Sequence, residues 1–220
     1  MMKKMEDLKL FINTLRHDFS KQTLDKKDVN NNPFVQFEKW IKEAIEAQVN
    51  EPNAMTLCTA TKEGKPSARI VLLRNFTEDG FIYYTNYTSR KGIEISDNPN
   101  CAILFFWPEL ERQIRIEGEV QKQTSEESDL YFNTRPRESK IGAWTSSQSK
   151  VISDREVLNK EFEINSNKYP TDMIPRPVFW GGFVVKPLTI EFWQGRPNRL
   201  HDRILYTKEN NNWKIDRLAP

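Results

Sequence analysis

The sequence predicts an α+β protein that is mainly β, with an antiparallel β-barrel and flanking helices. Three observations support this fold class. Short runs rich in β-branched and aromatic residues follow one another from residue 54 onward, separated by turn residues. Helical periodicity is found before residue 50 and in a few short segments between the strands. The regular alternation of strand and helix that marks a doubly wound fold is missing.

Two helices are expected in the first 50 residues. Leu8, Phe11, Ile12 and Leu15 recur at helical spacing and predict a short amphipathic helix. Asn32 followed by Pro33 is typical of a second helix start, with an N-cap and a proline at the first helical position. The apolar stripe of this second helix comprises Phe37, Trp40, Ile41, Ala44 and Ile45.

The strands are expected in segments that combine high β-propensity with turn residues at their ends. In "RQIRIEGEVQ" (112–121) the alternation is clear, because Ile114, Ile116 and Val120 fall on one face and the charged residues on the other. The expected strands are "AMTLCTAT" (54–61), "SARIVLLRNF" (67–76), "FIYYTNY" (81–87), "CAILFFW" (101–107), "RQIRIEGEVQ", "WGGFVVKPLTIEFW" (180–193), "DRILYTKE" (202–209) and "NWKIDRL" (212–218).

Three helix starts are expected among these strands. A short helix begins near Ser89. Thr124 with Glu127 three residues later forms a capping box, and Ser153 with Glu156 repeats that signature. Most residues of one aromatic set are interpreted as core or dimer-interface residues. The set is Phe105, Phe106, Trp107, Trp180 and Phe183.

Composition excludes several classes of protein. The chain has 33 Lys and Arg against 31 Asp and Glu, and a net charge of +2 is not that of a dedicated nucleic-acid binder. No signal peptide and no membrane-spanning segment are recognisable, so a soluble cytoplasmic protein is expected. Cys58 and Cys101 are expected to be buried thiols, and two Cys and two His without ligand spacing predict no metal site.

Cationic side chains gather around one of the two histidines. If "NRLHDRILY" is extended, Arg199, His201 and Arg203 project from the same face. Such a group is stabilised by an anion, because Arg binds phosphate or carboxylate with two parallel hydrogen bonds. The same pattern also fits the solvated face of an amphipathic strand, and these residues alone do not separate the two interpretations.

The sequence has three further cationic clusters, and none of them is accompanied by a glycine-rich phosphate loop. Arg90 and Lys91 follow Ser89 at a helix start, where the helix dipole favours anions over cations. Arg69 and Arg74 bracket four aliphatic residues, on opposite faces unless the strand bulges. Arg135, Arg137 and Lys140 lie in a proline-broken segment after Tyr131, which is interpreted as a loop. Phosphates, if bound, are therefore held mainly by side chains, although a plain solvated surface remains open for each cluster.

Nine motifs in order resemble the pyridoxamine 5′-phosphate oxidase family. They cover nearly everything from residue 54 to residue 220, while "LRHDF" and "FEKW" match more loosely. Any one motif is weak, but their order and spacing are specific. The motifs are "RIVLLR", "YYTNYTSRKG", "ERQIRIEG", "YFNTRPRESKIGAW", "SQS", "FWGGF", "EFWQG", "RLHDR" and "WKIDRLAP".

The resemblance implies an FMN-binding split β-barrel that works as a homodimer with FMN at the subunit interface. It divides the chain into an N-terminal helical segment and lid, residues 1–50, and an FMN-binding domain with the dimerisation and substrate region, residues 51–220. It implies oxidation of pyridoxamine or pyridoxine 5′-phosphate to pyridoxal 5′-phosphate, with O2 reduced to H2O2. Nucleic acids and membranes are not expected partners.

The resemblance also implies roles for individual residues. Arg199 and His201 match the catalytic residues over the substrate ring. The FMN contacts match Arg69, Ile70, Val71, Leu72, Leu73, Arg74, Tyr84, Thr85, Arg90, Lys91, Gln113, Gln148, Ser149, Trp193 and Arg203. The substrate contacts match Arg16, Phe19, Arg74, Tyr131, Arg135, Ser139, Arg199, Leu200 and His201.

The sequence departs from the family pattern at a few of these positions. Position 74 is Arg where Lys is expected, which changes hydrogen-bond geometry while keeping the charge. Phe19 replaces a Tyr of the lid, and His17 stands where a basic residue is frequent. Three alternatives stay open: a related split-barrel flavoprotein with another substrate, a non-catalytic module that binds FMN or pyridoxal phosphate, and a nucleic-acid-binding barrel with aromatic platforms.

Overall fold

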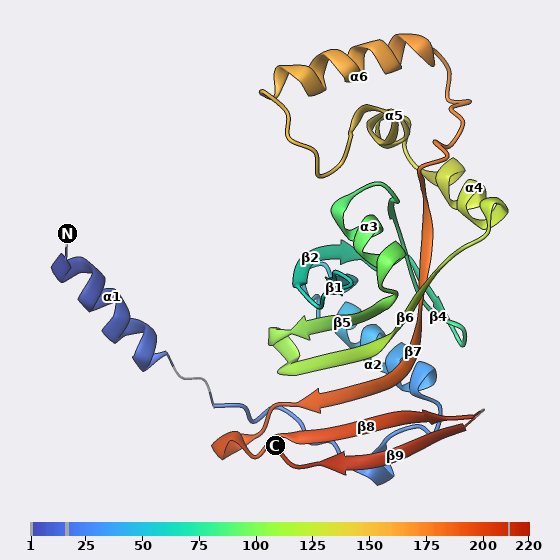
Figure 1. The fold of residues 1–220 in the computed structure, drawn as a ribbon. Helices are drawn as coiled ribbons and strands as arrows, with labels where there is room; N and C mark the ends of the chain where they lie inside the picture. The colour runs from blue at the N-terminus through green and yellow to red at the C-terminus, as the bar shows by residue number, and fades with distance from the viewer. Residues whose placement is uncertain (1, 16–17, 211) are drawn as a thin grey trace.

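The computed structural model describes residues 2–15, 18–210 and 212–220 (Figure 1). The helices are α1 (Met2–Thr14), α2 (Pro33–Glu46), α3 (Arg90–Asp97), α4 (Ser125–Thr134), α5 (Arg137–Thr145) and α6 (Glu156–Lys168), with short 3₁₀ turns η1 (Lys26–Asp28), η2 (Pro108–Leu110) and η3 (Pro197–Arg199). The strands are β1 (Ala54–Ala60), β2 (Pro66–Leu72), β3 (Asn75–Thr77), β4 (Gly80–Asn86), β5 (Asn100–Trp107), β6 (Arg112–Lys122), β7 (Trp180–Gln194), β8 (Asp202–Glu209) and β9 (Asn212–Leu218).

All strands of the described chain belong to one antiparallel sheet. Its main path runs β2-β1-β5-β6-β7-β4-β3, and β8 and β9 branch from β7. The mainly β, α+β fold class is therefore confirmed. The expected barrel is not closed, because β2 and β3 end the path and no described strand pair joins them.

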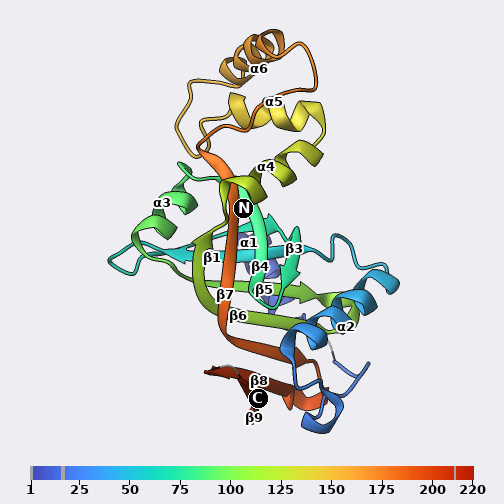
Figure 2. The ribbon, with the colours of Figure 1, turned by 90° about the vertical axis from the view of Figure 1, so that its right-hand side faces the viewer.

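Strand β7 accounts for the branching of the sheet. It pairs with β6 on one edge, while its other edge pairs first with β4, over Trp180–Val185, and then with β8, over Thr189–Gln194. The β6–β7 register shifts between Glu117 and Gly118, where a Cβ on Gly118 would lie 2.1 Å from the Lys186 carbonyl oxygen. A bulge of this kind bends the strand pair. Figure 2 shows α4 to α6 beyond one end of β7, and β8 and β9 beside its other end.

The main core lies between α2 and the sheet. Phe37, Trp40 and Ala44 of α2 are buried against strand residues such as Phe105 and Phe192. Burying a large apolar side chain stabilises the fold by roughly 1.5–3 kcal/mol, so this face anchors α2. Ile45 was expected in the same stripe but is 59% exposed. Ala44 next to it is fully buried, so the edge of the buried face of α2 lies between these two residues. A smaller core at the other end joins Phe132, Ile141, Ile174 and Trp180.

The helix starts follow the sequence in most cases. Asn32 accepts from the Phe34 amide and precedes Pro33, and the Thr124–Glu127 capping box is formed in both directions. Ser89 caps α3, since its hydroxyl accepts from the Gly92 amide. The expected Ser153 capping box is wrong: Ser153 donates to Asp154, and it is Asp154 that accepts from the Val157 amide near the start of α6.

Three other expectations need correction or qualification. The segment around Arg137 and Lys140 is helix α5, not a loop, because Pro136 precedes the first helical residue, where a missing amide proton costs nothing. Cys58 and Cys101 are free thiols and only half-buried. Helix α1 extends away from the sheet (Figure 1), and the apolar residues Leu8, Phe11 and Ile12 of this helix, with Leu15 just after it, are exposed.

In the described part of the chain, no helix combines the length and the apolar character that crossing a bilayer requires.

Candidate functional site

Two adjoining cavities open where β2, β4 and α3 meet α4 and α5. The first, the strand cavity, has a volume of about 570 Å³ and is lined by Ser67–Leu72, Arg90, Lys91 and Ser149. The second, the helix cavity, has a volume of about 370 Å³ and is lined mainly by residues from α4, α5 and Trp180. Both cavities are bordered by the same four residues, Arg74, Tyr84, Thr85 and Gln148. Two ligands, or two parts of one ligand, can therefore lie in contact across this shared border.

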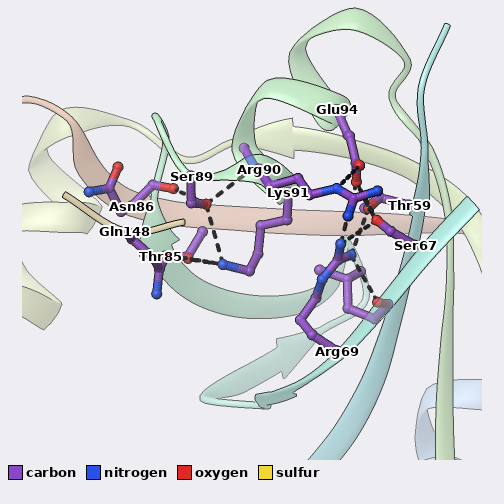
Figure 3. Close-up of polar contacts among 12 residues, drawn as sticks. Thr59, Ser67, Arg69, Thr85, Asn86, Ser89, Arg90, Lys91, Glu94 and Gln148 are labelled. Atoms are coloured by element: carbon purple, nitrogen blue, oxygen red, sulfur yellow. Dashed lines mark hydrogen bonds and ion pairs between the residues drawn. The ribbon is translucent and has the colours of Figure 1, made fainter. Parts of the chain in front are cut away.

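Lys91 is the most deeply buried cation of the strand cavity, with 8% of its surface exposed. Its Nζ donates to Gln148 Oε1 at 3.0 Å, to Thr85 Oγ1 at 3.2 Å and to Ser89 Oγ at 3.3 Å (Figure 3). Burial, aided by the nearby Arg69, lowers the pKa of Lys91 to about 8. Within the described residues none of its hydrogen-bond partners is a carboxylate. A buried ammonium with only neutral partners is a site that an anion stabilises.

Two of the three arginines that line the strand cavity share one carboxylate. Arg90 Nε donates to Glu94 Oε1 at 2.8 Å, and Arg69 Nη2 lies 3.3 Å from Glu94 Oε2 (Figure 3). The four cations that line this cavity, together with Glu94, leave a local net charge of +3. This charge is opposite in sign to that of a phosphomonoester, which carries about −1.5 to −2 at neutral pH. The strand cavity is therefore suited to a terminal phosphate.

Arg135 supplies the positive charge of the helix cavity. Its guanidinium lies 4.5 Å from the ring centroid of Trp180, as a cation over the ring face. Burial lowers the pKa of Arg135, and its Nη1 atom is buried without a hydrogen-bond partner in the described chain. Ser139 and Tyr131 line the same cavity. A buried, unpaired guanidinium nitrogen beside two hydroxyls is a second candidate anion site.

A stack of three rings holds this wall of the helix cavity in place. The rings of Tyr84 and Tyr131 are 3.7 Å apart with 12° between their planes, and Tyr84 lies 5.7 Å from Trp180 at 14°. Burial raises the pKa of Tyr84 to about 12, so its hydroxyl stays protonated and can donate at neutral pH. The stack joins β4, α4 and β7, so Tyr131 and Arg135 are held relative to the strand cavity.

Arg199 and His201 lie in a third cavity, the loop cavity, of about 570 Å³ at the other end of β7. His201 Nδ1 accepts from the Arg196 amide at 3.1 Å, which fixes the tautomer with the proton on Nε2. The His201 ring lies 4.6 Å from Trp193 and 5.7 Å from Phe19. Burial and the charge of Arg199 lower the pKa of His201, against a smaller opposing effect of Asp202.

The expectation that Arg199, His201 and Arg203 share one extended face is wrong. Asn198 and Arg199 have left-handed backbone angles, with φ of 58° and 60°, and β8 begins only at Asp202. Arg203 instead donates to both oxygens of the buried Glu191, at 2.7 and 3.1 Å. Gln113 lies opposite Trp193 in the β6–β7 ladder.

The expected site residues thus form two groups at the two ends of β7. Thr85 and Tyr84 pair with Gly181 and Gly182, whereas Arg203 pairs with Trp193. At about 3.3 Å per residue, the eleven steps from Gly182 to Trp193 span up to roughly 35 Å along the strand. A single pair of stacked ring ligands does not reach both groups within one chain.

A few expected residues fall outside the cavities. Leu73 is buried in the main core, and the exposed Leu200 lies beside the loop cavity without lining it. Arg16 and His17 lie outside the described residues. Sequence reasoning missed Glu94, although its spacing of four from Arg90 is a helical ion-pair signal. It also gave Trp180 no site role, because the Arg135 contact is non-local.

Solved structures with this fold include one that is described as an FMN-binding protein. An FMN-binding protein from Nostoc punctiforme, described as pyridoxamine 5′-phosphate oxidase-related, superposes with a TM-score of 0.68 at 17% identity, covering 84% of this chain and 97% of its own. PhzG from Burkholderia lata, solved with tetrahydrophenazine-1-carboxylic acid, has a TM-score of 0.85 at 31% identity, covering 91% of this chain and 100% of its own. The chain therefore shares the fold of both proteins.

The chain belongs to the pyridoxamine 5′-phosphate oxidase family. Residues 41–164 match the family model "Pyridoxamine 5′-phosphate oxidase", and residues 180–220 match "Pyridoxine 5′-phosphate oxidase C-terminal dimerisation region". Relatives named pyridoxine/pyridoxamine 5′-phosphate oxidase are 55% identical in Nostoc punctiforme, over 207 residues, and 55% identical in Burkholderia thailandensis, over 212 residues. Each match covers 94% of this chain and 97% of the relative. The family resemblance expected from the motifs is confirmed.

Proposed function

We propose that this chain is an FMN-dependent oxidase of phosphorylated B6 vitamers. It oxidises pyridoxine 5′-phosphate directly to pyridoxal 5′-phosphate, and it oxidises pyridoxamine 5′-phosphate to an imine that water hydrolyses to pyridoxal 5′-phosphate and ammonia. In both reactions O2 is reduced to H2O2. The observation that carries the proposal is the pair of adjoining cavities, each with a buried cation that has no carboxylate partner in the described chain, Lys91 in one and Arg135 Nη1 in the other. Two phosphate sites with a common border fit a phosphorylated cofactor and a phosphorylated substrate with their rings in contact.

The residues of the strand cavity fit FMN. Lys91, Arg69 and Arg90 would hold its phosphate, and the backbone from Arg69 to Leu72 with Tyr84 and Thr85 would lie along the flavin. When bound, FMN accepts two electrons from the substrate and passes them to O2. The chain's part is to bind and orient, because a phosphate held far from the reacting carbon supplies positioning energy.

The residues of the helix cavity fit the substrate phosphate. Arg135, Tyr131 and Ser139 would bind it, and Arg74, on the common border, is near enough to both cavities to contact either ligand. The planar guanidinium of Arg74 offers two parallel donors where a lysine would offer one charge centre.

A second copy of the chain would complete the site. Arg199 and His201 lie at the far end of β7 from the strand cavity, so we infer that they reach the substrate ring from the partner subunit. The family match at residues 180–220, described as a dimerisation region, supports a homodimer with FMN at the interface. Arg199 would orient the ring and stabilise developing charge, and neutral His201 would present its Nε2 proton.

Mixed dimers test this shared site. Arg135→Ala and Arg199→Met are each expected to have strongly reduced activity as homodimers. In a mixed dimer of the two variants, both substitutions fall in one site and the other site is intact. Random reassociation makes about half of the dimers mixed, so activity returns at about a quarter of all sites. No recovery in verified mixed dimers would mean that each site is built from a single chain.

Substrate tests separate the proposal from its alternatives. The likeness to PhzG favours, as a second candidate, a related flavoprotein with another substrate. The purified yellow protein should lose its flavin absorption when pyridoxine 5′-phosphate is added without O2, and should release H2O2 in air. Bleaching by tetrahydrophenazine-1-carboxylic acid and not by the vitamer would favour the second candidate. Flavin that never bleaches would indicate a binding module without turnover.

A further inference from the structure

A buried carboxylate lies behind the cationic wall of the strand cavity. Glu94 is on the second turn of α3, is 5% exposed, and is not one of the residues that line the cavity. Its two oxygens serve different partners: Oε1 accepts from Arg90 Nε, and Oε2 faces Arg69 (Figure 3). Both arginines do line the cavity. Glu94 therefore touches the residues that would meet a ligand without meeting the ligand itself.

Two hydroxyl groups strengthen the link between Glu94 and Arg69. Thr59 accepts from Arg69 Nη1 at 2.6 Å and donates to Glu94 Oε2 at 2.5 Å. Ser67 accepts from Arg69 Nη2 at 2.5 Å and donates to the same Glu94 oxygen at 2.6 Å. Each hydroxyl therefore donates its proton to Glu94 and accepts a hydrogen bond from Arg69. The network fixes the plane of the Arg69 guanidinium from behind, because charge-assisted hydrogen bonds are short and directional.

The orientation of the Arg90 side chain depends on Glu94 more strongly than the orientation of Arg69 does. Arg69 has a further partner in the Leu57 carbonyl oxygen, at 3.1 Å. The Arg90 side chain is 63% exposed, and Glu94 is its partner in the described chain. A long exposed side chain loses substantial rotamer entropy when a ligand orders it. If a partner within the protein already orders the side chain, less entropy is lost on ligand binding.

We propose that Glu94 is a positioning residue for the phosphate site, where it holds Arg69 and Arg90 in the orientation that receives a phosphomonoester. The inference rests on the proposed function, since it takes the strand cavity as the FMN phosphate site. Glu94 is ionised at neutral pH. Burial alone would raise its pKa, but hydrogen bonds from Ser67, Thr59 and Arg90 lower it to about 2.

A purely electrostatic role would have the opposite sign. The negative charge of Glu94 repels a phosphate, so if charge alone mattered, its removal would tighten FMN binding. If orientation dominates, removal weakens FMN binding and leaves riboflavin, which has no phosphate, nearly unaffected. The ratio of the two affinities therefore separates orientation from charge and from a general loss of structure.

The experiment titrates flavin-free full-length chain with FMN and with riboflavin, followed by flavin fluorescence. Glu94→Ala should weaken FMN binding by roughly 10- to 100-fold, the range for hydrogen bonds to charged groups, with a change below about threefold for riboflavin. Glu94→Gln keeps one acceptor oxygen and should lose less. Glu38→Ala removes an exposed ion pair on α2 and serves as the control, with both affinities unchanged.

A double-mutant cycle with Arg90→Ala tests the route of the effect. If Glu94 acts through Arg90, then Glu94→Ala should reduce FMN affinity less in the Arg90→Ala protein than in the wild type. Tighter FMN binding by both Glu94 variants, or equal losses for FMN and riboflavin, would overturn the proposal while leaving the phosphate site intact. A wild-type protein with no preference for FMN over riboflavin would instead overturn the phosphate site, and this proposal with it.

Discussion

Lys91 Nζ donates to the side-chain oxygen of Gln148 at 3.0 Å, and this bond joins α3 to the segment that follows α5. The two residues are 57 positions apart, yet both border the strand cavity. The ammonium is buried, and its partners are an amide and two hydroxyls, so its charge is solvated but not neutralised. The buried charge of Lys91 therefore destabilises the ligand-free protein, and a bound anion would remove this destabilisation.

FMN affinity should depend on the ionisation of Lys91. Because the pKa of Lys91 is about 8 in the ligand-free chain, the group is charged below that pH and must take up a proton to bind phosphate above it. The FMN dissociation constant should be nearly flat from pH 6.5 to 7.5 and rise by up to about tenfold per pH unit above 8. Lys91→Arg keeps its charge and should show no such rise. A wild-type profile that stays flat to pH 9.5 would contradict this assignment.

Replacing Lys91 with Met should stabilise the flavin-free protein while weakening FMN binding. The folded-state pKa of Lys91 lies below its ordinary value of 10.5, so the unfolded chain binds more protons between pH 8 and 10.5. The destabilisation is fully present below pH 8 and is relieved as the pH rises. We expect the free energy of unfolding in urea to rise by about 1–2 kcal/mol at pH 7, a value reduced to allow for partial solvation of the Lys91 ammonium. The rise at pH 9.5 should be smaller. Equal gains at both pH values would point to packing.

His201 should lose its positioning role when it is protonated. Its Nδ1 accepts from the Arg196 amide, and a proton on Nδ1 abolishes that hydrogen bond. Its pKa is lowered from 6.5, so kcat/KM should fall only at acid pH, below the ordinary histidine range. His201→Asn places a carbonyl oxygen near the position of Nδ1 and does not titrate. This variant should be slower but should lack the acid limb, unless that limb belongs to the substrate phosphate.

Arg135 should govern substrate binding and not cofactor binding. Arg135→Ala removes the unpaired guanidinium of the helix cavity and should lower kcat/KM for the phosphorylated vitamers by roughly 30- to 100-fold, as for a lost charge-assisted hydrogen bond. FMN content should not change. Arg135→Lys keeps the charge without the planar contact on Trp180 and should recover only part of the loss. A parallel loss of FMN would show that the two cavities hold one ligand.

Gly195 should be intolerant of alanine because of Phe19. A Cβ at Gly195 would lie 2.6 Å from the Phe19 ring, which itself packs against Trp193 and His201. Gly195→Ala should displace Phe19 and lower kcat/KM by about tenfold with normal FMN content. The Phe19 Cβ would lie 2.7 Å away as well, so only Phe19→Gly in the same chain removes the clash, and it should restore part of the activity. Additive losses in the double variant would exclude a steric cause.

Much of the fold follows from local sequence patterns. The alternation in residues 112–121 and the Asn32–Pro33 and Thr124–Glu127 signals are local, and each forms the element that was expected. Helix α5 was missed because Pro136 resembles a helix breaker, although proline is compatible with a helix start. The sheet does not close into the expected barrel, because closure depends on which strand edges remain unpaired, and short-range patterns do not encode this.

The sequence by itself determined the chemistry of the candidate site. It identified the family through ordered motifs, and it supplied cations without a glycine-rich phosphate loop. Only the tertiary structure decided how these residues are grouped: Arg199 and His201 lie at the opposite end of β7 from Lys91, and Glu94 links Arg69 to Arg90. The physical reason is that residue type and periodicity are properties of short sequence segments. Contacts between distant side chains depend instead on strand register and on the bend at Gly118. Both arise from backbone pairing between segments distant in the sequence.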